Sequence, residues 1–221
     1  MTPVDFHFDV ICPWAYQASI WIREAAAVRD LDVTWRYFSL EEINREPDAK
    51  HPWERPWSYG WSLMRIAVRL GRDDPGLVGD WYAAAGKALH VDARKVHTLQ
   101  GSEAVLAEMR LDPALAGEAV GDPTTNEAVL GDHQRVVNAG GFGVPTLFFG
   151  DSGAVFGPVV APAPTGEAAG QLWDLVTRWQ DFAHLYELQR LKSAADRDHI
   201  AAAFAPTFAA RDWRSVQHPA G

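Results

Sequence analysis

Cysteine is nearly absent from this sequence, whose 221 residues contain one, Cys12. A single cysteine cannot form a disulfide within the chain, so any thiol chemistry must involve a second molecule. Long apolar runs are absent as well: no window reaches the ~18 apolar residues of a membrane-spanning helix. The first residues, MTPVDFHFDV, also lack a basic segment followed by a long apolar one. We therefore expect a cytoplasmic protein with no membrane partner.

Basic residues are outnumbered, since 20 Lys and Arg stand against 29 Asp and Glu, for a net charge of −9. Nucleic acids and anionic membranes attract basic patches, so this balance argues against both as main partners. The eight histidines follow neither HExxH nor a paired Cys/His spacing, and we expect no metal site. Residues 140–143 (GGFG) precede a predicted strand rather than a helix, which is wrong for a dinucleotide fingerprint. We expect no tightly bound cofactor.

The first 40 residues alternate between two periodicities. Apolar residues at every second position predict a strand over 4–10, and helical spacing with opposed charges follows over 13–30. Alternation returns over 33–40 and predicts a second strand. A strand, a helix and a strand with a short link form a right-handed crossover, so the two strands should be parallel neighbours.

The rest of the chain predicts helices followed by a hairpin and a last helix. Helices are expected over 62–70, 75–90, 92–108, 113–120 and 123–139, with no strand between 54 and 139. Strands follow at 144–149 and 154–156 around a Gly-Asp-Ser-Gly turn, and Thr165 is placed to cap a long helix. After residue 192 the pattern leaves open a helix broken at Pro206 or a loosely attached tail.

This order of elements indicates an α/β protein with a thioredoxin-like fold and an inserted all-helical domain. The predicted core comprises residues 1–53 and 140–192, the insertion residues 54–139, and a C-terminal extension residues 193–221.

Cys12 lies where the first strand gives way to the first helix, and Pro13 suits the first helical position because its missing N–H would have no partner there. Free N–H groups and the helix dipole stabilise a thiolate at that place. The thiol pKa should then fall from its usual ~8.5 toward neutrality. We expect an exposed, acidic nucleophile, although a lone cysteine is also compatible with a buried apolar role.

The segment Val144-Pro145-Thr146 places a proline inside a predicted strand, where it cannot donate to the sheet. A cis bond before Pro145 would explain it and would turn the Val144 backbone toward the helix N-terminus, where it could pair with an extended thiol substrate. A plain edge-strand proline is the alternative.

Other aromatic and histidine residues allow two interpretations each. The series Trp53, Trp57 and Trp61 is spaced as on one helix face and predicts core packing or, less favoured, a flat apolar wall, although nearby prolines argue against one continuous helix. His90 is either a proton donor or orienting group near Cys12 or a histidine held by the helix C-terminus. His7 should be structural.

Several motifs resemble one family. They are FDVICPWAY (8–16), SLEEIN (39–44), AAAGKALH (83–90), GVPTLFFG (143–150), FGPV (156–159), PTGEAAGQLWD (164–174) and HLYELQR (184–190). The chain thereby resembles the DsbA-like branch of the thioredoxin superfamily, and most of all the actinobacterial mycothiol-dependent reductases, often called mycothiol-dependent nitroreductases. The resemblance covers about residues 4–192.

The resemblance implies roles for particular residues. Cys12 would be the nucleophile, Trp14 a lid beside it, Pro145 the cis-proline and Thr146 its polar neighbour, with His90 and Asn44 near the thiol. The predicted catalytic residues are thus Cys12 and His90, and the predicted binding residues are Pro13, Trp14, Asn44, Val144, Pro145 and Thr146. The resemblance implies a cytosolic enzyme that takes electrons from mycothiol and passes them to a disulfide or another electrophile. We expect mycothiol or glutathione as the cosubstrate.

One departure from the family is chemically important: its usual motif is CPWC, and this sequence has Ala15 in place of the second cysteine. A mixed disulfide on Cys12 must then be released by a second thiol molecule, which predicts a monothiol reductase. A thiol transferase or isomerase like the kappa-class glutathione transferases and chromene-carboxylate isomerases is the alternative, followed by a non-catalytic binding protein. The sequence leaves open whether the chain forms a homodimer.

Overall fold

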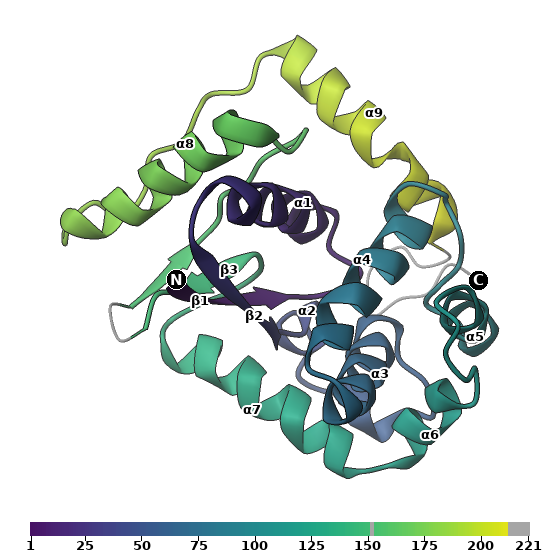
Figure 1. Cartoon of the computed structure of the whole chain (residues 1–221). Coiled ribbons are helices and arrows are strands. Elements are labelled where there is room, and N and C mark those ends of the chain that lie inside the picture. Colours follow the sequence, from purple (N-terminus) through teal and green to yellow (C-terminus); the bar gives the residue numbers. More distant parts are fainter. Residues whose placement is uncertain (151–152, 212–221) are drawn as a thin grey trace.

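A four-stranded sheet forms the centre of the computed structural model, which describes residues 1–150 and 153–211 (Figure 1). Its strands are β1 (Thr2–Phe8), β2 (Leu31–Tyr37), β3 (Thr146–Phe148) and β4 (Ala154–Phe156), in the order β2-β1-β3-β4. The pair β1/β2 is parallel and the other two pairs are antiparallel, which confirms the predicted crossover and hairpin. Of the predicted turn between β3 and β4, Asp151 and Ser152 lie outside the described residues.

The strands β1 and β2 both begin and end two or three residues earlier than predicted. β1 stops at Phe8 because the next residue, Asp9, turns the chain: its carbonyl accepts the Cys12 N–H at 3.1 Å. β2 stops because Ser39 caps the next helix, α2 (Leu40–Ile43), by accepting the Glu42 N–H. Both turns bring polar backbone groups to the same end of the sheet.

Helices cover both faces of the sheet. α1 (Pro13–Val28) and α8 (Gly166–Arg178) lie on one side and α7 (Thr124–Asn138) on the other (Figure 1). Trp21 of α1 is fully buried, and its indole N–H donates to the Ala169 carbonyl of α8 at 3.0 Å. Thr165 occupies the predicted cap position of α8, but its side chain makes no capping bond. The Gly166 N–H instead donates to Glu24 of α1, at 3.0 Å.

The middle of the chain is helical, as predicted. After a 3₁₀ turn (Pro52–Glu54) come α3 (Tyr59–Asp73), α4 (Gly76–His90), α5 (Leu99–Glu108) and α6 (Leu115–Gly121), and α7 leads back to the sheet. The helix predicted from residue 92 begins only at Leu99, because the Thr98 hydroxyl caps it by accepting the Gly101 N–H. Residues 92–98 form a loop instead.

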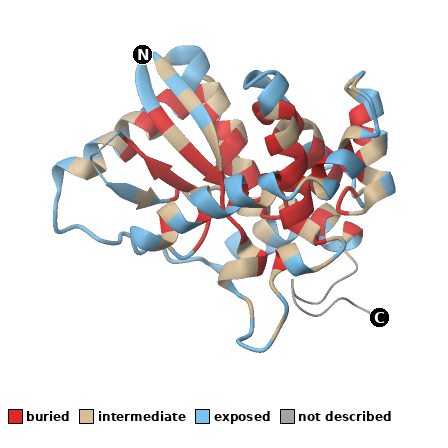
Figure 2. Cartoon of the chain, turned by 90° about the horizontal axis from the view of Figure 1, so that it is seen from below, coloured by how far each residue is buried: buried red, intermediate tan, exposed pale blue. Residues whose placement is uncertain are grey.

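The buried core runs from the sheet into these helices without a break (Figure 2). Trp53 and Trp61 pack against each other 5.1 Å apart, but they lie on separate elements because residues 55–58 are not helical. Trp61 is fully buried in this core, which confirms the packing interpretation of the tryptophans. Because one core serves both parts, the division into a sheet domain and a helical insertion stays a prediction.

The chain after α8 ends in a helix, α9 (Ala194–Ala210), which lies against α4 (Figure 1). Of the two alternatives left open, the structure shows a helix, and it continues through Pro206 rather than breaking there. A capping box at Ser193 and Asp196 starts it.

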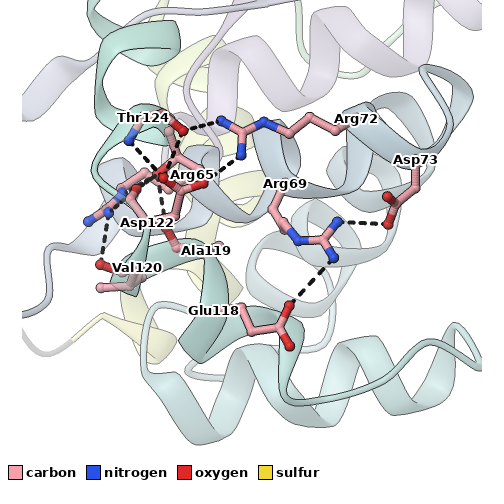
Figure 3. A network of polar contacts seen from close by, with 10 residues as sticks. Arg65, Arg69, Arg72, Asp73, Glu118, Ala119, Val120, Asp122 and Thr124 are labelled. Atoms are coloured by element: carbon pink, nitrogen blue, oxygen red, sulfur yellow. Dashed lines mark hydrogen bonds and ion pairs between the residues drawn. The ribbon is translucent and has the colours of Figure 1, made fainter.

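Arg65 ties α3 to α6 and α7 (Figure 3). It is 4% exposed and donates to the carbonyls of Val120 and Asp122 and to the Thr125 hydroxyl, at 2.7–2.9 Å. The two carbonyls belong to the C-terminal end of α6, where carbonyls have no partner within the helix. Arg69, on the next turn of α3, makes a more exposed pair with Asp73.

We expect Arg65→Met to lower the free energy of unfolding by about 2–4 kcal/mol, because it leaves buried acceptors without donors. The matched control is Arg69→Met, which should cost less than about 1 kcal/mol because its partners remain solvated. Urea unfolding of both variants measures the difference. Equal losses in the two variants would contradict the role assigned to Arg65.

Candidate active site

The chain turns from β1 into α1 at Cys12, which is the N-cap residue of α1 with Pro13 at the first helical position. The Cys12 sulfur accepts the Ala15 N–H at 3.4 Å, and the Cys12 carbonyl accepts the Tyr16 N–H at 3.0 Å. Pro13 needs no partner here because it has no N–H. The strand, the proline and the free N–H groups therefore place the sulfur where the sequence predicted.

A second segment meets this turn from far along the chain. The Val144–Pro145 bond is cis, as predicted, and the Val144 carbonyl oxygen lies 3.7 Å from the Cys12 sulfur. The thiol is thus placed to donate to Val144 across the end of the sheet. Thr146, the next residue, is buried, and its hydroxyl donates to the Gly143 carbonyl at 2.7 Å. Thr146 therefore shapes the proline turn rather than contacting the sulfur.

The Cys12 thiol is buried and not exposed, which corrects the sequence-based expectation. Only 6% of the residue is exposed, because it packs in a cluster with Ala15, Phe38, Val136, Val144 and Phe148. Burial raises the pKa of the thiol to about 12, and the nearby Asp9 charge adds to the rise. The N–H groups of Ala15 and Trp14 act in the opposite direction but do not prevail. In this closed arrangement Cys12 is a protonated thiol.

Two buried carboxylates next to the turn were missed by the sequence analysis. Asp9 is fully buried and accepts the N–H groups of Ile11 at 3.2 Å and Leu40 at 2.8 Å, and burial raises its pKa to about 7. Glu41 is 1% exposed, accepts the N–H groups that begin α3, and pairs with Arg55 at 3.2 Å. Asp9 stands at a polar position of the alternation over residues 4–10, as Asp5 does, so the pattern carried no signal of its burial.

His90 ends α4 and is 5% exposed. Its Nε2 lies 2.8 Å from the Val10 carbonyl and its Nδ1 2.8 Å from the Thr207 hydroxyl. Because a carbonyl only accepts, Nε2 carries the hydrogen and Nδ1 accepts from Thr207. Burial lowers the His90 pKa to about 4, so the ring is neutral. Both nitrogens are engaged by partners other than Cys12, which favours an orienting role over proton donation.

Trp14 and Asn44 are the remaining predicted binding residues. Trp14 is half-buried next to the Cys12 cluster and meets the Phe204 ring of α9 edge-on at 4.6 Å. Asn44 ends α2, is exposed, and donates to the Leu40 carbonyl at 2.9 Å. Its neighbour Ile43 packs against the cluster that holds Cys12. The binding roles of both residues stay predictions.

His7 and His133 occupy the same side of the sheet as this cluster. His7 is fully buried against the Phe148 ring, and burial lowers its pKa to about 3. His133 of α7 stacks on Phe38, and its Nδ1 accepts the Ser39 N–H at 3.2 Å.

Within residues 1–150 and 153–211, no group of three or more His, Cys, Asp or Glu side chains could hold a metal ion. No helix of the same ranges is long and apolar enough to span a membrane.

The order of the strands and the helices around them define a protein with a thioredoxin-like fold. A profile of the Rv2466c-like family, described as mycothiol-dependent nitroreductase Rv2466c, matches residues 11–190. The chain is also 50% identical over 216 residues to the uncharacterized protein Rv2286c of Mycobacterium tuberculosis, covering 98% of this chain and 94% of that protein. The chain therefore belongs to the Rv2466c-like family, and this membership supports an oxidoreductase.

Solved structures agree on the fold. A 2-hydroxychromene-2-carboxylate isomerase superposes with a TM-score of 0.58 at 15% identity, covering 82% of this chain and 96% of that one. The cytosolic disulfide reductase DsbM from Pseudomonas aeruginosa with GSH gives 0.57 at 15% identity, covering 80% and 99%. The oxidoreductase DsbA from Xylella fastidiosa gives 0.54 at 14% identity, covering 81% and 86%. These likenesses support the thioredoxin-like fold predicted from the order of elements.

The Asp9 charge should slow the reaction of Cys12 with an alkylating reagent. Asp9 titrates at about 7, so its charge, which raises the thiol pKa, is present above that pH and absent below it. We expect Asp9→Asn to alkylate about threefold faster than the native protein near pH 9 and at about the same rate near pH 6. Iodoacetamide kinetics followed by intact mass measure this. The control is Asp30→Asn at an exposed position; a ratio that does not change with pH would refute the coupling.

Proposed function

We propose that this protein is a monothiol reductase in which Cys12 is the nucleophile. Mycothiol, or a similar low-molecular-weight thiol such as glutathione, donates electrons to a disulfide or another electrophile. The observation that carries the proposal is the Cys12 sulfur at the first turn of α1, facing the cis-Pro145 turn. The name of the matching family supports mycothiol as donor, and the DsbM structure with GSH supports a small thiol as cosubstrate. We expect the enzyme to act in the cytoplasm, where such thiols are kept reduced.

The proposed reaction consists of two thiol–disulfide exchanges. The Cys12 thiolate attacks the mycothiol sulfur of a mixed disulfide, which breaks that S–S bond and releases the other half as a thiolate that takes up a proton. Cys12 is then joined to mycothiol by a new disulfide. A free mycothiol thiolate attacks this mycothiol sulfur and regenerates Cys12. The net result is that one mixed disulfide and one mycothiol are converted to the free substrate thiol and one mycothiol disulfide.

Activation of the thiol is tied to opening of the site. In the closed arrangement burial outweighs the N–H groups of the first turn of α1, and the thiol keeps its proton. A substrate that separates Cys12 from Val144 brings in solvent or its own polar groups and so removes the burial. The N–H groups and the helix dipole then favour the thiolate, as at other helix N-termini. The Val144 carbonyl, released from the thiol, becomes free to accept from the substrate backbone.

The other residues around the sulfur have separate proposed roles. Pro145 and Thr146 hold the turn that presents the Val144 backbone, and Pro13 begins the helix without a competing N–H. Trp14, which packs against the cluster that contains Cys12 and against Phe204 of α9, would act as a lid. Asn44, exposed at the end of α2, would contact the polar part of the small thiol.

Ala15 supports a second candidate function. It is fully buried and occupies the position from which a second cysteine would resolve the mixed disulfide. A transferase or isomerase needs no second cysteine, because the enzyme forms no disulfide with its thiol cosubstrate, and a chromene-carboxylate isomerase has this fold. In that case the residue at position 12 would only donate a hydrogen bond, as Cys12 does to Val144 here.

Cys12→Ser separates the two candidates. For a reductase, incubation with mycothiol disulfide should give one adduct per native chain by intact mass, reversed by free mycothiol, and none on Cys12→Ser. We expect turnover of mixed disulfides to fall by at least ~10³-fold in the variant, since a hydroxyl cannot replace a thiolate nucleophile. No adduct on the native protein, together with binding of reduced mycothiol that survives in Cys12→Ser, would favour the isomerase or transferase.

Ala15→Cys should convert the enzyme to a dithiol one. The new thiol would lie three residues after Cys12 in the first turn of α1, where the Ala15 N–H already contacts the sulfur. We expect it to release the Cys12 adduct without added thiol and leave an intramolecular disulfide. Mass spectrometry under denaturing conditions would detect this, with Ala18→Cys, one turn further on, as the control. An adduct that persists in Ala15→Cys would mean that position 15 does not face the mixed disulfide.

A further inference from the structure

Helix α9 follows the residues that the family profile matches, yet it reaches the site. The profile ends at residue 190, and α9 begins at Ala194. Three of its side chains are buried, Phe204, Thr207 and Ala210, and they all lie in the second half of the helix. This half lies against α4, at the end of the molecule where α1 begins (Figure 1).

Two of these side chains hold the two flanks of the Cys12 turn. Thr207 donates to His90, whose Nε2 donates in turn to the carbonyl of Val10, two residues before Cys12. Phe204 packs edge-on against Trp14, two residues after Cys12, with ring centroids 4.6 Å apart. One helix therefore contacts both sides of the turn that carries the thiol, through one hydrogen-bonded chain and one ring contact.

The segment that connects α8 to α9 adds little to this attachment. Its large apolar side chains are exposed: Phe182 by 61%, Tyr186 by 85%, Leu188 by 78% and Leu191 by 89%. Residues 194–199 of α9 are exposed as well. Docking of α9 thus depends on a few side chains around Phe204 and Thr207, and such weakly packed elements open more readily than a core does.

We propose that α9 acts as a clasp: it holds the residues on both sides of Cys12, Val10 and Trp14, in place. Phe204 and Thr207 are its positioning residues, and they limit access to the thiol. The inference rests on the proposed function only in treating Cys12 as the reactive group. Movement of residues 10–14 would separate the sulfur from Val144, and α9 opposes this movement through its contacts at Trp14 and, by way of His90, at Val10. Release of α9 frees both flanks and lets a bulky thiol cosubstrate approach.

The test is the rate at which full-length protein reacts at Cys12 with iodoacetamide. We expect Phe204→Ala to raise this rate about tenfold, because weaker docking populates the open turn more often. The matched control is Phe208→Ala, which removes the same side chain from an exposed position of the same helix and should change the rate less than about twofold. Equal rates in the two variants would overturn the clasp.

Thr207 provides an independent test that changes almost no volume. Thr207→Val removes the hydroxyl that donates to His90 and should also speed alkylation, whereas Thr207→Ser keeps the hydroxyl and should restore the native rate. Thermal unfolding of each variant is measured alongside. If Thr207→Val and Thr207→Ser were alkylated equally fast, and the rate rose only in proportion to the loss of thermal stability, Phe204 and Thr207 would serve general packing. That result would reject the proposal.

Alkylation and adduct formation also keep this proposal separate from the function. Iodoacetamide needs only an accessible thiol, whereas the mixed disulfide needs recognition of mycothiol. Faster alkylation of Phe204→Ala together with no mycothiol adduct on any variant would support the clasp and refute the reductase. A mycothiol adduct together with an unchanged alkylation rate in Phe204→Ala and Thr207→Val would support the reductase and refute the clasp.

Discussion

The rest of the site depends on the meeting of the Cys12 sulfur with the Val144 carbonyl at the end of the sheet. This contact joins the first turn of α1 to the cis-proline turn, two segments 132 residues apart in sequence. The pairing of β1 with β3 brings them together, because Phe6 lies opposite Leu147 and His7 opposite Thr146. Once the strands are paired, the sulfur has a polar partner on one side and apolar side chains on the others. The same contact explains both the protected thiol of the closed state and the place where a substrate backbone would enter.

Buried acidic groups fix the surroundings of this contact. Asp9 links the end of β1 to the start of α2, and Glu41 links α2 to the start of α3, each by accepting backbone N–H groups that would otherwise be buried without partners. A helix N-terminus stabilises a nearby anion, which offsets part of the cost of burying Glu41. The burial of Asp9 has a different consequence, because the Asp9 charge raises the pKa of the Cys12 thiol and so disfavours the thiolate. Asp9 and Glu41 therefore frame a thiol that burial and the Asp9 charge keep protonated.

Much of the fold could be predicted from the sequence, because the periodicities of β1, α1 and β2 are strong and the cis-proline directly precedes a clear strand, β3. Strand ends were misplaced where side chains such as Asp9 and Ser39 redirect the backbone, which periodicity does not report. The position of Cys12 followed from its place before Pro13, but its exposure did not, since Phe38 and Val136 come from distant segments. The contacts of α9 left no signal in the sequence. Residues 194–210 are rich in alanine, and Phe204 and Thr207 contact residues that are far from them along the chain.

The central claim is that Cys12 forms a mixed disulfide with mycothiol beside the Val144 backbone. A crystal structure of the full-length protein after incubation with mycothiol disulfide tests this most directly. The account predicts a disulfide on Cys12, loss of its hydrogen bond to Val144, and the mycothiol chain lying along the cis-proline turn. Mycothiol bound without a covalent bond, with Cys12 still donating to the Val144 carbonyl, would contradict it.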